Sequence, residues 1–187
     1  MTNMSIVPGS LQALASQNNK SIAETFTSAE CLVLVDTSGS MGEHDSRGGK
    51  SRYDVACEEL ANLQARMPGK IAVLSFSDTT VFCPGGQPIN LGSSTNLRGA
   101  LEFAKCADVP GVRFVVISDG QPDDAAGALK LAAQYHNRID TIYVGPEGGY
   151  GQEFLARLAS VKNGKSLVSA QAKELSSTVE TLLLNAG

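Results

Sequence analysis

The sequence has no apolar run near the roughly 18–20 residues that a membrane-spanning helix needs, so no membrane span is predicted. It also has no cluster of lysine and arginine, and its net charge of −4 excludes the basic surface typical of nucleic-acid-binding proteins. The N-terminal sequence MTNMSIVPGS has neither the basic start nor the apolar core of a secretory signal. We therefore expect neither a nucleic acid nor a membrane as a partner.

The four cysteines are far apart in the sequence, so no C-x-x-C pair of the metal-binding or redox type is present. Cys31 lies in a strand-like segment, and Cys57 and Cys106 lie in helix-like segments. In such places a cysteine is usually a small buried hydrophobic residue. Reduced thiols and the absence of a signal segment predict a cytoplasmic protein.

With 42% hydrophobic and 18% charged residues among 187, the chain has the composition of a folded globular domain. Apolar strand-like segments alternate with segments of helical periodicity, which favours a parallel sheet covered by helices on both faces. The expected strands cover residues 31–36, 71–76, 81–83, 112–118, 139–145 and 165–169, and the expected helices cover residues 52–67, 96–106, 123–137, 151–160 and 172–184.

Polar residues ahead of this alternation predict a helical extension over residues 1–27. Ser10 precedes the first short helical pattern, LQALASQ. Ser21 precedes Glu24 by three positions, which is the spacing of a capping box at the start of a second short helix.

The segment CLVLVDTSGSMG, residues 31–42, is the most informative part of the chain. Its apolar half has no alternation, as expected of a strand buried on both faces of a parallel sheet. Asp36, Ser38 and Ser40 follow at alternate positions on a glycine-containing turn. In open α/β sheets ligands bind at the carboxyl ends of the strands, and an oxygen-only set of this kind suits Mg²⁺ or Mn²⁺.

Two further segments extend this set. The segment FVVISDGQP repeats the order of apolar strand, aspartate and glycine, so Asp119 is also expected at the end of a strand. Thr95 lies just before a helical pattern between the two strand-end segments. A threonine there could instead cap the helix, with Ser94 as the alternative cap.

At these residues the chain resembles the von Willebrand factor type A domain, over residues 28–187. That family carries a D-x-S-x-S turn, a threonine from a second loop and an aspartate from a third, which form its metal-ion-dependent adhesion site. The matching residues, which the resemblance implies as metal ligands, are Asp36, Ser38, Ser40, Thr95 and Asp119.

The resemblance implies a doubly wound, Rossmann-like three-layer α/β sandwich with a mostly parallel central sheet of about six strands in the order 3-2-1-4-5-6. One antiparallel edge strand is expected where the short link SDTT precedes VFC. The resemblance also implies a bound Mg²⁺, or Mn²⁺ or Ca²⁺, and a partner protein whose Glu or Asp completes the coordination. Intracellular relatives in bacteria commonly pair with AAA+ ATPases, which makes such an ATPase a candidate partner.

Other kinds of functional site fit the sequence less well. An EF-hand fails because its sixth and twelfth positions would be Met41 and Arg47 rather than Gly and Glu. A nucleophilic serine lacks a G-x-S-x-G segment, and no Walker A segment marks an NTPase. A phosphatase of the aspartyl-phosphate type could use Asp36, but it needs a second acidic residue where this chain has Ser38.

Two classes of function therefore stay open. The first, favoured, is a metal-dependent protein-interaction module without enzyme activity, working in an intracellular assembly. The alternative is a metal-dependent hydrolase that uses the same strand-end carboxylates; it is disfavoured because no general base lies near the motif.

Overall fold

The computed structural model describes residues 6–45, 49–145 and 150–168. Six strands form one sheet: β1 (Cys31–Asp36), β2 (Ile71–Phe76), β3 (Thr80–Phe82), β4 (Arg113–Ser118), β5 (Ile139–Tyr143) and β6 (Ser166–Val168). The helices are α1 (Leu11–Gln17), α2 (Ile22–Phe26), α3 (Arg52–Arg66), α4 (Leu97–Ala104), α5 (Ala125–Ala132) and α6 (Tyr150–Ser160), with short 3₁₀ turns at Gly39–Gly42 and Lys105–Ala107.

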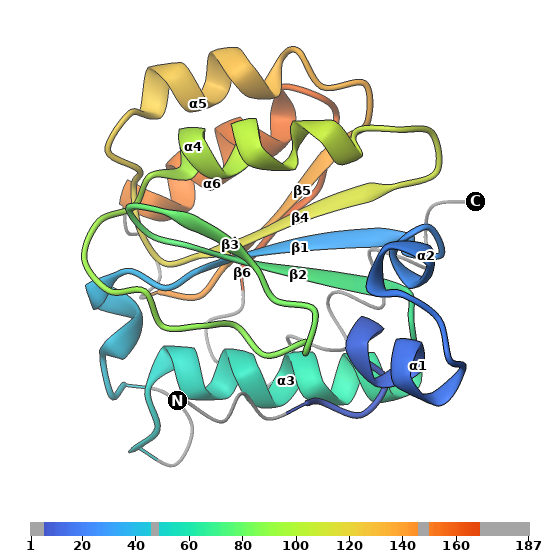
Figure 1. Ribbon diagram of the computed structural model, residues 1–187. Helices are drawn as coiled ribbons and strands as arrows, with labels where there is room; N and C mark the ends of the chain where they lie inside the picture. The colour runs from blue at the N-terminus through green and yellow to red at the C-terminus, as the bar shows by residue number, and fades with distance from the viewer. Residues whose placement is uncertain (1–5, 46–48, 146–149, 169–187) are drawn as a thin grey trace.

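The sheet has the order β3-β2-β1-β4-β5-β6, and this confirms the predicted doubly wound topology. All neighbouring strands are parallel except β2 and β3, which form the expected antiparallel pair at one edge. Every residue of β1 is buried, as its unbroken apolar sequence predicted. Figure 1 shows α4, α5 and α6 on one side of the sheet and α3, with α1 beside it, on the other.

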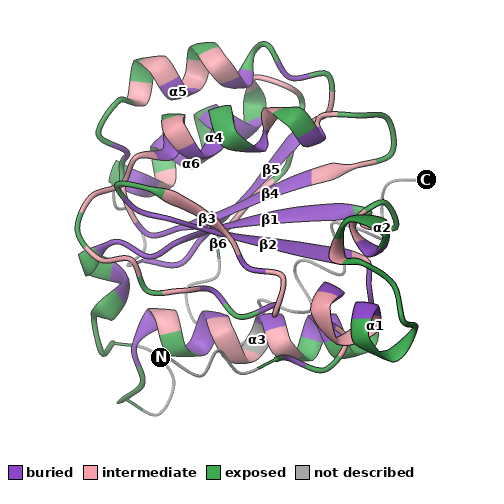
Figure 2. Ribbon diagram, viewed as in Figure 1, coloured by how far each residue is buried: buried purple, intermediate pink, exposed green. Residues whose placement is uncertain are grey.

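Alternate residues of the central strands supply two separate cores, one under each helical layer. Figure 2 shows the buried residues that run along these strands. In β1, Leu32 and Leu34 pack with the α4–α6 layer, whereas Val33 and Val35 pack with the α3 layer. This alternation is the period-2 geometry of a strand buried on both faces. None of the helices in the part of the chain that the structure describes has the length and apolar character needed to cross a bilayer.

The first two helices begin at the residues expected to cap them. The hydroxyl oxygen of Ser10 accepts from the Ala13 amide, and Ser21 and Glu24 form a reciprocal capping box. Gly9, at φ +82°, lies so close to α3 that a Cβ there would meet the carbonyl of Gln64. The division between a helical extension (1–27) and the following domain stays a prediction.

Helix α5 is shorter than expected. The pattern over 123–137 predicted a continuous helix, but α5 ends at Ala132. The backbone amides of His136 and Asn137 donate to the carboxylate of Asp108, at 2.7 and 3.0 Å, and this draws the chain out of the helix towards β5. The closing helix predicted over 172–184 lies outside the described residues.

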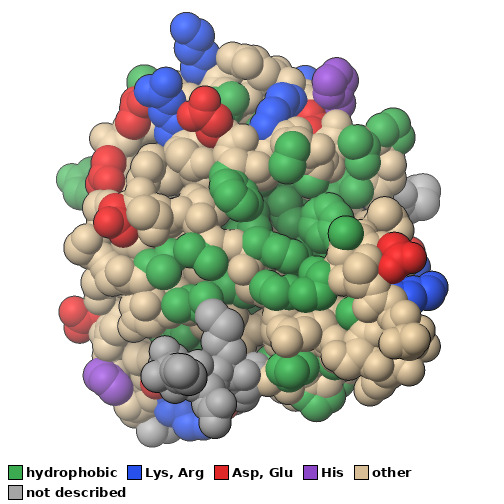
Figure 3. Space-filling view, in the orientation of Figure 1, with side chains coloured by type: hydrophobic (Ala, Val, Ile, Leu, Met, Phe, Trp, Pro, Cys, Tyr) green, Lys and Arg blue, Asp and Glu red, His purple; other side chains and the backbone are tan. Residues whose placement is uncertain are grey.

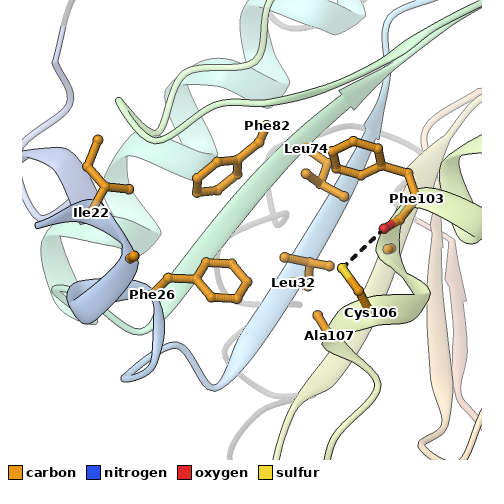
Figure 4. A pocket seen from close by; sticks show the side chains of 10 residues that line it. Ile22, Phe26, Leu32, Leu74, Phe82, Phe103, Cys106 and Ala107 are labelled. Atoms are coloured by element: carbon orange, nitrogen blue, oxygen red, sulfur yellow. Dashed lines mark hydrogen bonds between the residues drawn. The ribbon is translucent and has the colours of Figure 1, made fainter.

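An apolar pocket of about 400 Å³ opens between α2 and α4, above the β1–β3 part of the sheet. Figure 3 shows the apolar side chains that gather there, and Figure 4 shows Phe26 and Phe82 on one side and Phe103 and Cys106 on the other. Cys106 is exposed at this pocket, so the prediction that it is a buried hydrophobic residue is wrong. It falls in the 3₁₀ turn after α4, where the helical periodicity that implied burial has ended.

The carboxylate of Asp108 is only 1% exposed and organises the connection between α5 and β5. Burial raises the pKa of this carboxyl, but hydrogen bonds from Lys105 and from the His136 and Asn137 backbone outweigh burial and hold the pKa well below its usual range. A carboxylate with a lowered pKa stabilises the fold above the pKa of the unfolded chain, about 3.9, and loses that effect as the pH falls.

We expect Asp108→Asn to lower the free energy of unfolding by about 1–3 kcal/mol at pH 7, because buried amide donors lose a charged acceptor. The difference from the wild type should shrink as the pH is lowered below about 4. Urea denaturation across this pH range measures both effects. Asp78→Asn is the control, since Asp78 is exposed, and an equal loss in both variants would contradict the assignment.

Candidate metal centre

The site forms where β1 and β4 end side by side. The two strands are parallel neighbours, and Val35 of β1 pairs with Ile117 of β4. The next residues, Asp36 and Ser118, are therefore brought to the same edge of the sheet, and Asp119 follows one position later. This is the carboxyl edge of the sheet, at which ligands bind in open α/β folds.

Hydrogen bonds link four of the five predicted ligands into one cluster. Asp36 is fully buried and accepts from the Ser38 amide, at 2.8 Å, and from the Ser118 hydroxyl, at 2.6 Å. The hydroxyl oxygens of Ser38 and Ser40 lie 3.2 Å apart, and the Ser40 hydroxyl donates to Asp119 Oδ1 at 2.9 Å.

The turn after β1 holds the two serines in this arrangement. Ser38 precedes the 3₁₀ turn Gly39–Gly42, and Met41 in that turn is buried in the core below α3. Met41 fixes the turn to the core, because its side chain packs with the inner residues of β1 and β2. The neighbouring Ser40 is exposed and lies at the surface of the site.

The loop that carries Thr95 is joined to its two neighbouring loops by backbone hydrogen bonds. The carbonyl of Thr95 accepts from the amide of Asp123, at 3.1 Å, in the loop after β4. The amide of Gly92 donates to the carbonyl of Thr37, at 3.2 Å, in the loop after β1. The N-cap of α4 is Asn96, so neither Thr95 nor Ser94 caps this helix. The three predicted loops therefore lie together, with Thr95 between α4 and the loop after β4.

The two carboxylates lie in a buried and electrostatically strained environment. Burial raises the pKa of Asp36, hydrogen bonds from Ser118 and Ser38 oppose the rise, and the charge of Asp119 adds to it. The Asp119 side chain has no exposed surface. A pair of buried anions is costly unless positive charge or hydrogen-bond donors are close by.

Arg52 supplies positive charge that the sequence analysis did not foresee. Its Nη1 donates to Asp119 Oδ2 at 2.6 Å, and its other edge donates to both oxygens of Asp45. The hydrogen bonds with Asp45 raise the pKa of Arg52 and lower that of Asp45. An arginine after Ser51 at the start of a helix gave no signal in the sequence, because such a residue is usually solvated.

The residues present fit a hard divalent cation. Within the described residues no group of three or more His, Cys, Asp or Glu side chains could hold a metal, so a cation here would depend on hydroxyl oxygens as well as carboxylates. Neighbouring ligands of an octahedral Mg²⁺ with bonds of about 2.0–2.1 Å lie about 2.8–3.0 Å apart. The Ser38–Ser40 and Ser40–Asp119 oxygen separations, 3.2 and 2.9 Å, are close to that spacing.

Comparisons with solved structures identify the fold. An aerotolerance-related membrane protein from Bacteroides fragilis matches with a TM-score of 0.65 and 18% identity, over 83% of this chain and 98% of that one. The ArnB paralog VWA2 from Sulfolobus acidocaldarius matches with a TM-score of 0.60 and 23% identity, over 81% of this chain and 44% of that one. A von Willebrand factor type A protein from Catenulispora acidiphila matches with a TM-score of 0.56 and 14% identity, over 82% and 41%.

No protein-family model matches the sequence, and no curated protein matches it significantly. The structural matches therefore show the fold alone: the chain has the fold of von Willebrand factor type A domains.

The Ser118 hydroxyl is a support of the site that the sequence motif does not include. We expect Ser118→Ala to lower the free energy of unfolding by about 1–3 kcal/mol in EDTA, because the buried Asp36 carboxylate loses a donor. Chemical denaturation measures the change. Ser160→Ala is the matched control, since Ser160 is exposed and its hydroxyl donates to the Arg157 carbonyl of its own helix. Equal stabilities of the two variants would show that Ser118 does not support Asp36.

Proposed function

We propose that the chain is a metal-dependent protein-interaction module whose site binds Mg²⁺, or Mn²⁺ or Ca²⁺, and through it an acidic residue of a partner protein. The observation that carries this proposal is the convergence of Asp36, Ser38, Ser40 and Asp119 at the carboxyl edge of the sheet. The fold supports it, because proteins of this architecture include the von Willebrand factor type A proteins among the structural matches.

The residues divide into direct and supporting roles. Ser38, Ser40 and Thr95 would hold the cation by neutral hydroxyl oxygens, with Asp36 and Asp119 acting directly or through water. A cation held mainly by neutral ligands keeps positive charge and exchangeable water, which is the chemistry that the metal supplies. A carboxylate from a partner is the anionic ligand that such a site favours.

The loops around the site would determine which partner proteins fit against it. Three loops border the site, over residues 37–45, 84–96 and 119–124, and backbone hydrogen bonds join them to one another. We propose a partner with a surface Glu or Asp, with an AAA+ ATPase as one candidate, in an intracellular assembly. No enzyme activity is proposed.

Metal binding should depend on the charge of Asp36. Isothermal titration with Mg²⁺ and Mn²⁺ should show one site in the wild type and an affinity about 10–100-fold lower in Asp36→Asn. The same variant should be at least as stable as the wild type in EDTA, because burial raises the pKa of Asp36 and the neutral side chain avoids an ionised group at that position.

Ser40→Ala should weaken metal binding less than Asp36→Asn, because water replaces a neutral ligand more readily than a charged one. Asp78→Asn, on the exposed surface, should bind metal like the wild type. A wild type that binds no divalent metal would refute the proposed site.

Partner binding should require the metal and an acidic side chain on the partner. Affinity capture in Mg²⁺ should retain partners that EDTA releases, and Asp36→Asn should lose the same proteins. When the surface Glu and Asp residues of a captured partner are replaced one at a time, a single one of these replacements should abolish binding. Retention in EDTA would show that the domain binds through another surface.

Phosphatase and esterase assays with Mg²⁺ test the hydrolase alternative, and turnover that Asp36→Asn abolishes would favour it.

A further inference from the structure

A permanent positive charge sits directly beside the proposed metal ligands. The Arg52 side chain is 9% exposed, and its Nη1 lies 2.6 Å from Asp119 Oδ2. The opposite oxygen of the same carboxylate accepts from the Ser40 hydroxyl. Asp119 is thus shared between Arg52 on one side and the proposed metal ligands on the other.

We propose that Arg52 is an internal counter-cation of the metal site, which neutralises Asp119 when no metal is bound and limits the affinity for metal when it is. The proposal rests on the proposed function and adds a residue outside the ligand set that sets the strength of metal binding. It makes metal dispensable for folding, because the buried Asp119 carboxylate already has a positive partner and Asp36 already has two hydrogen-bond donors.

The charges of the cluster support this role. Asp36, Asp119 and Arg52 together carry a charge of −1, whereas the two carboxylates without the arginine would carry −2. Because arginine stays protonated in proteins, this positive charge is permanent. A divalent cation therefore meets a smaller negative charge and a repelling neighbour, and both effects weaken its binding.

Asp45 acts on the same arginine from the outside. Its side chain is 50% exposed and accepts from Nε of Arg52 at 2.8 Å and from Nη2. Asp45 therefore holds the guanidinium in place and offsets part of its charge. Without the negative charge of Asp45, the positive charge of Arg52 is no longer partly offset and repels a bound cation more strongly. Removing the charge of Asp45 should therefore weaken metal binding, whereas removing Arg52 should strengthen it.

Two variants of the full chain test the proposal by titration with Mn²⁺ and Mg²⁺ and by thermal unfolding in EDTA. Arg52→Gln should bind metal about tenfold more tightly than the wild type, because a repelling charge is removed, and should unfold at a lower temperature without metal. Asp45→Asn should bind metal several-fold more weakly, because a negative charge that offsets Arg52 is removed. A merely structural effect would weaken binding in both.

Matched controls are available on the surface. Arg98→Gln removes an arginine from an exposed ion pair with Asp124, and Asp78→Asn removes an exposed carboxylate; both should keep the wild-type metal affinity. Should Arg52→Gln be unfolded in EDTA, added Mn²⁺ should restore its fold, because the cation then supplies the positive charge that Arg52 places beside Asp119 in the wild type. No recovery with Mn²⁺ would refute the role of Arg52.

The outcomes separate this inference from the proposed function. If the wild type binds metal and Arg52→Gln binds no more tightly, or Asp45→Asn no more weakly, the role of Arg52 is refuted and the metal site stands. If the wild type shows no binding but Arg52→Gln does, the proposed function of the native chain fails and the role of Arg52 in limiting metal affinity is supported. If neither binds metal, both proposals fail.

Discussion

Two carboxylates held out of water at the ends of adjacent strands, Asp36 and Asp119, set the requirements that the rest of this site meets. Each is surrounded by protein, and burial together with the charge of Asp119 raises the pKa of Asp36. The structure compensates for them with donors from several directions: the Ser118 hydroxyl and the Ser38 amide on Asp36, and Ser40 and Arg52 on Asp119.

These donors depend on the sheet for their placement. The parallel register of β1 and β4 brings Asp36 opposite Ser118, and the buried Met41 fixes the turn that carries the serines. Helix α6 adds a constraint from the far side, since a Cβ at Gly151 would lie 2.9 Å from the carbonyl carbon of Gly120. The loop that carries Asp119 is therefore packed between the β1 turn and a helix, which limits how far it can move.

Much of this arrangement could be predicted from the sequence, because it depends on local patterns. An unbroken apolar run identified β1 as a central strand, and an aspartate directly after such a run is expected at the carboxyl edge of the sheet. The same logic placed Asp119. The strand order is confirmed, and four of the five predicted ligands are joined by hydrogen bonds.

The features that were missed depend on contacts between distant segments. Arg52 reaches Asp119 from the start of another helix, and nothing in the sequence around either residue indicates that contact. Likewise Asp108 ends α5 by binding amides that lie far along the chain, so the helical pattern over 123–137 overestimated its length. Cys106 was misplaced because the helix changes to a 3₁₀ turn just before it.

The parallel pairing of β1 with β4 has a consequence for the order of folding. The Ser118–Asp36 and Ser40–Asp119 bonds join residues 82 and 79 positions apart, and loops of that length close only after considerable chain entropy has been lost. The cluster can therefore form only once the centre of the sheet has assembled. A cation that bound this cluster would therefore bind a chain whose central strands had already paired, and it would stabilise that folded state rather than start its formation.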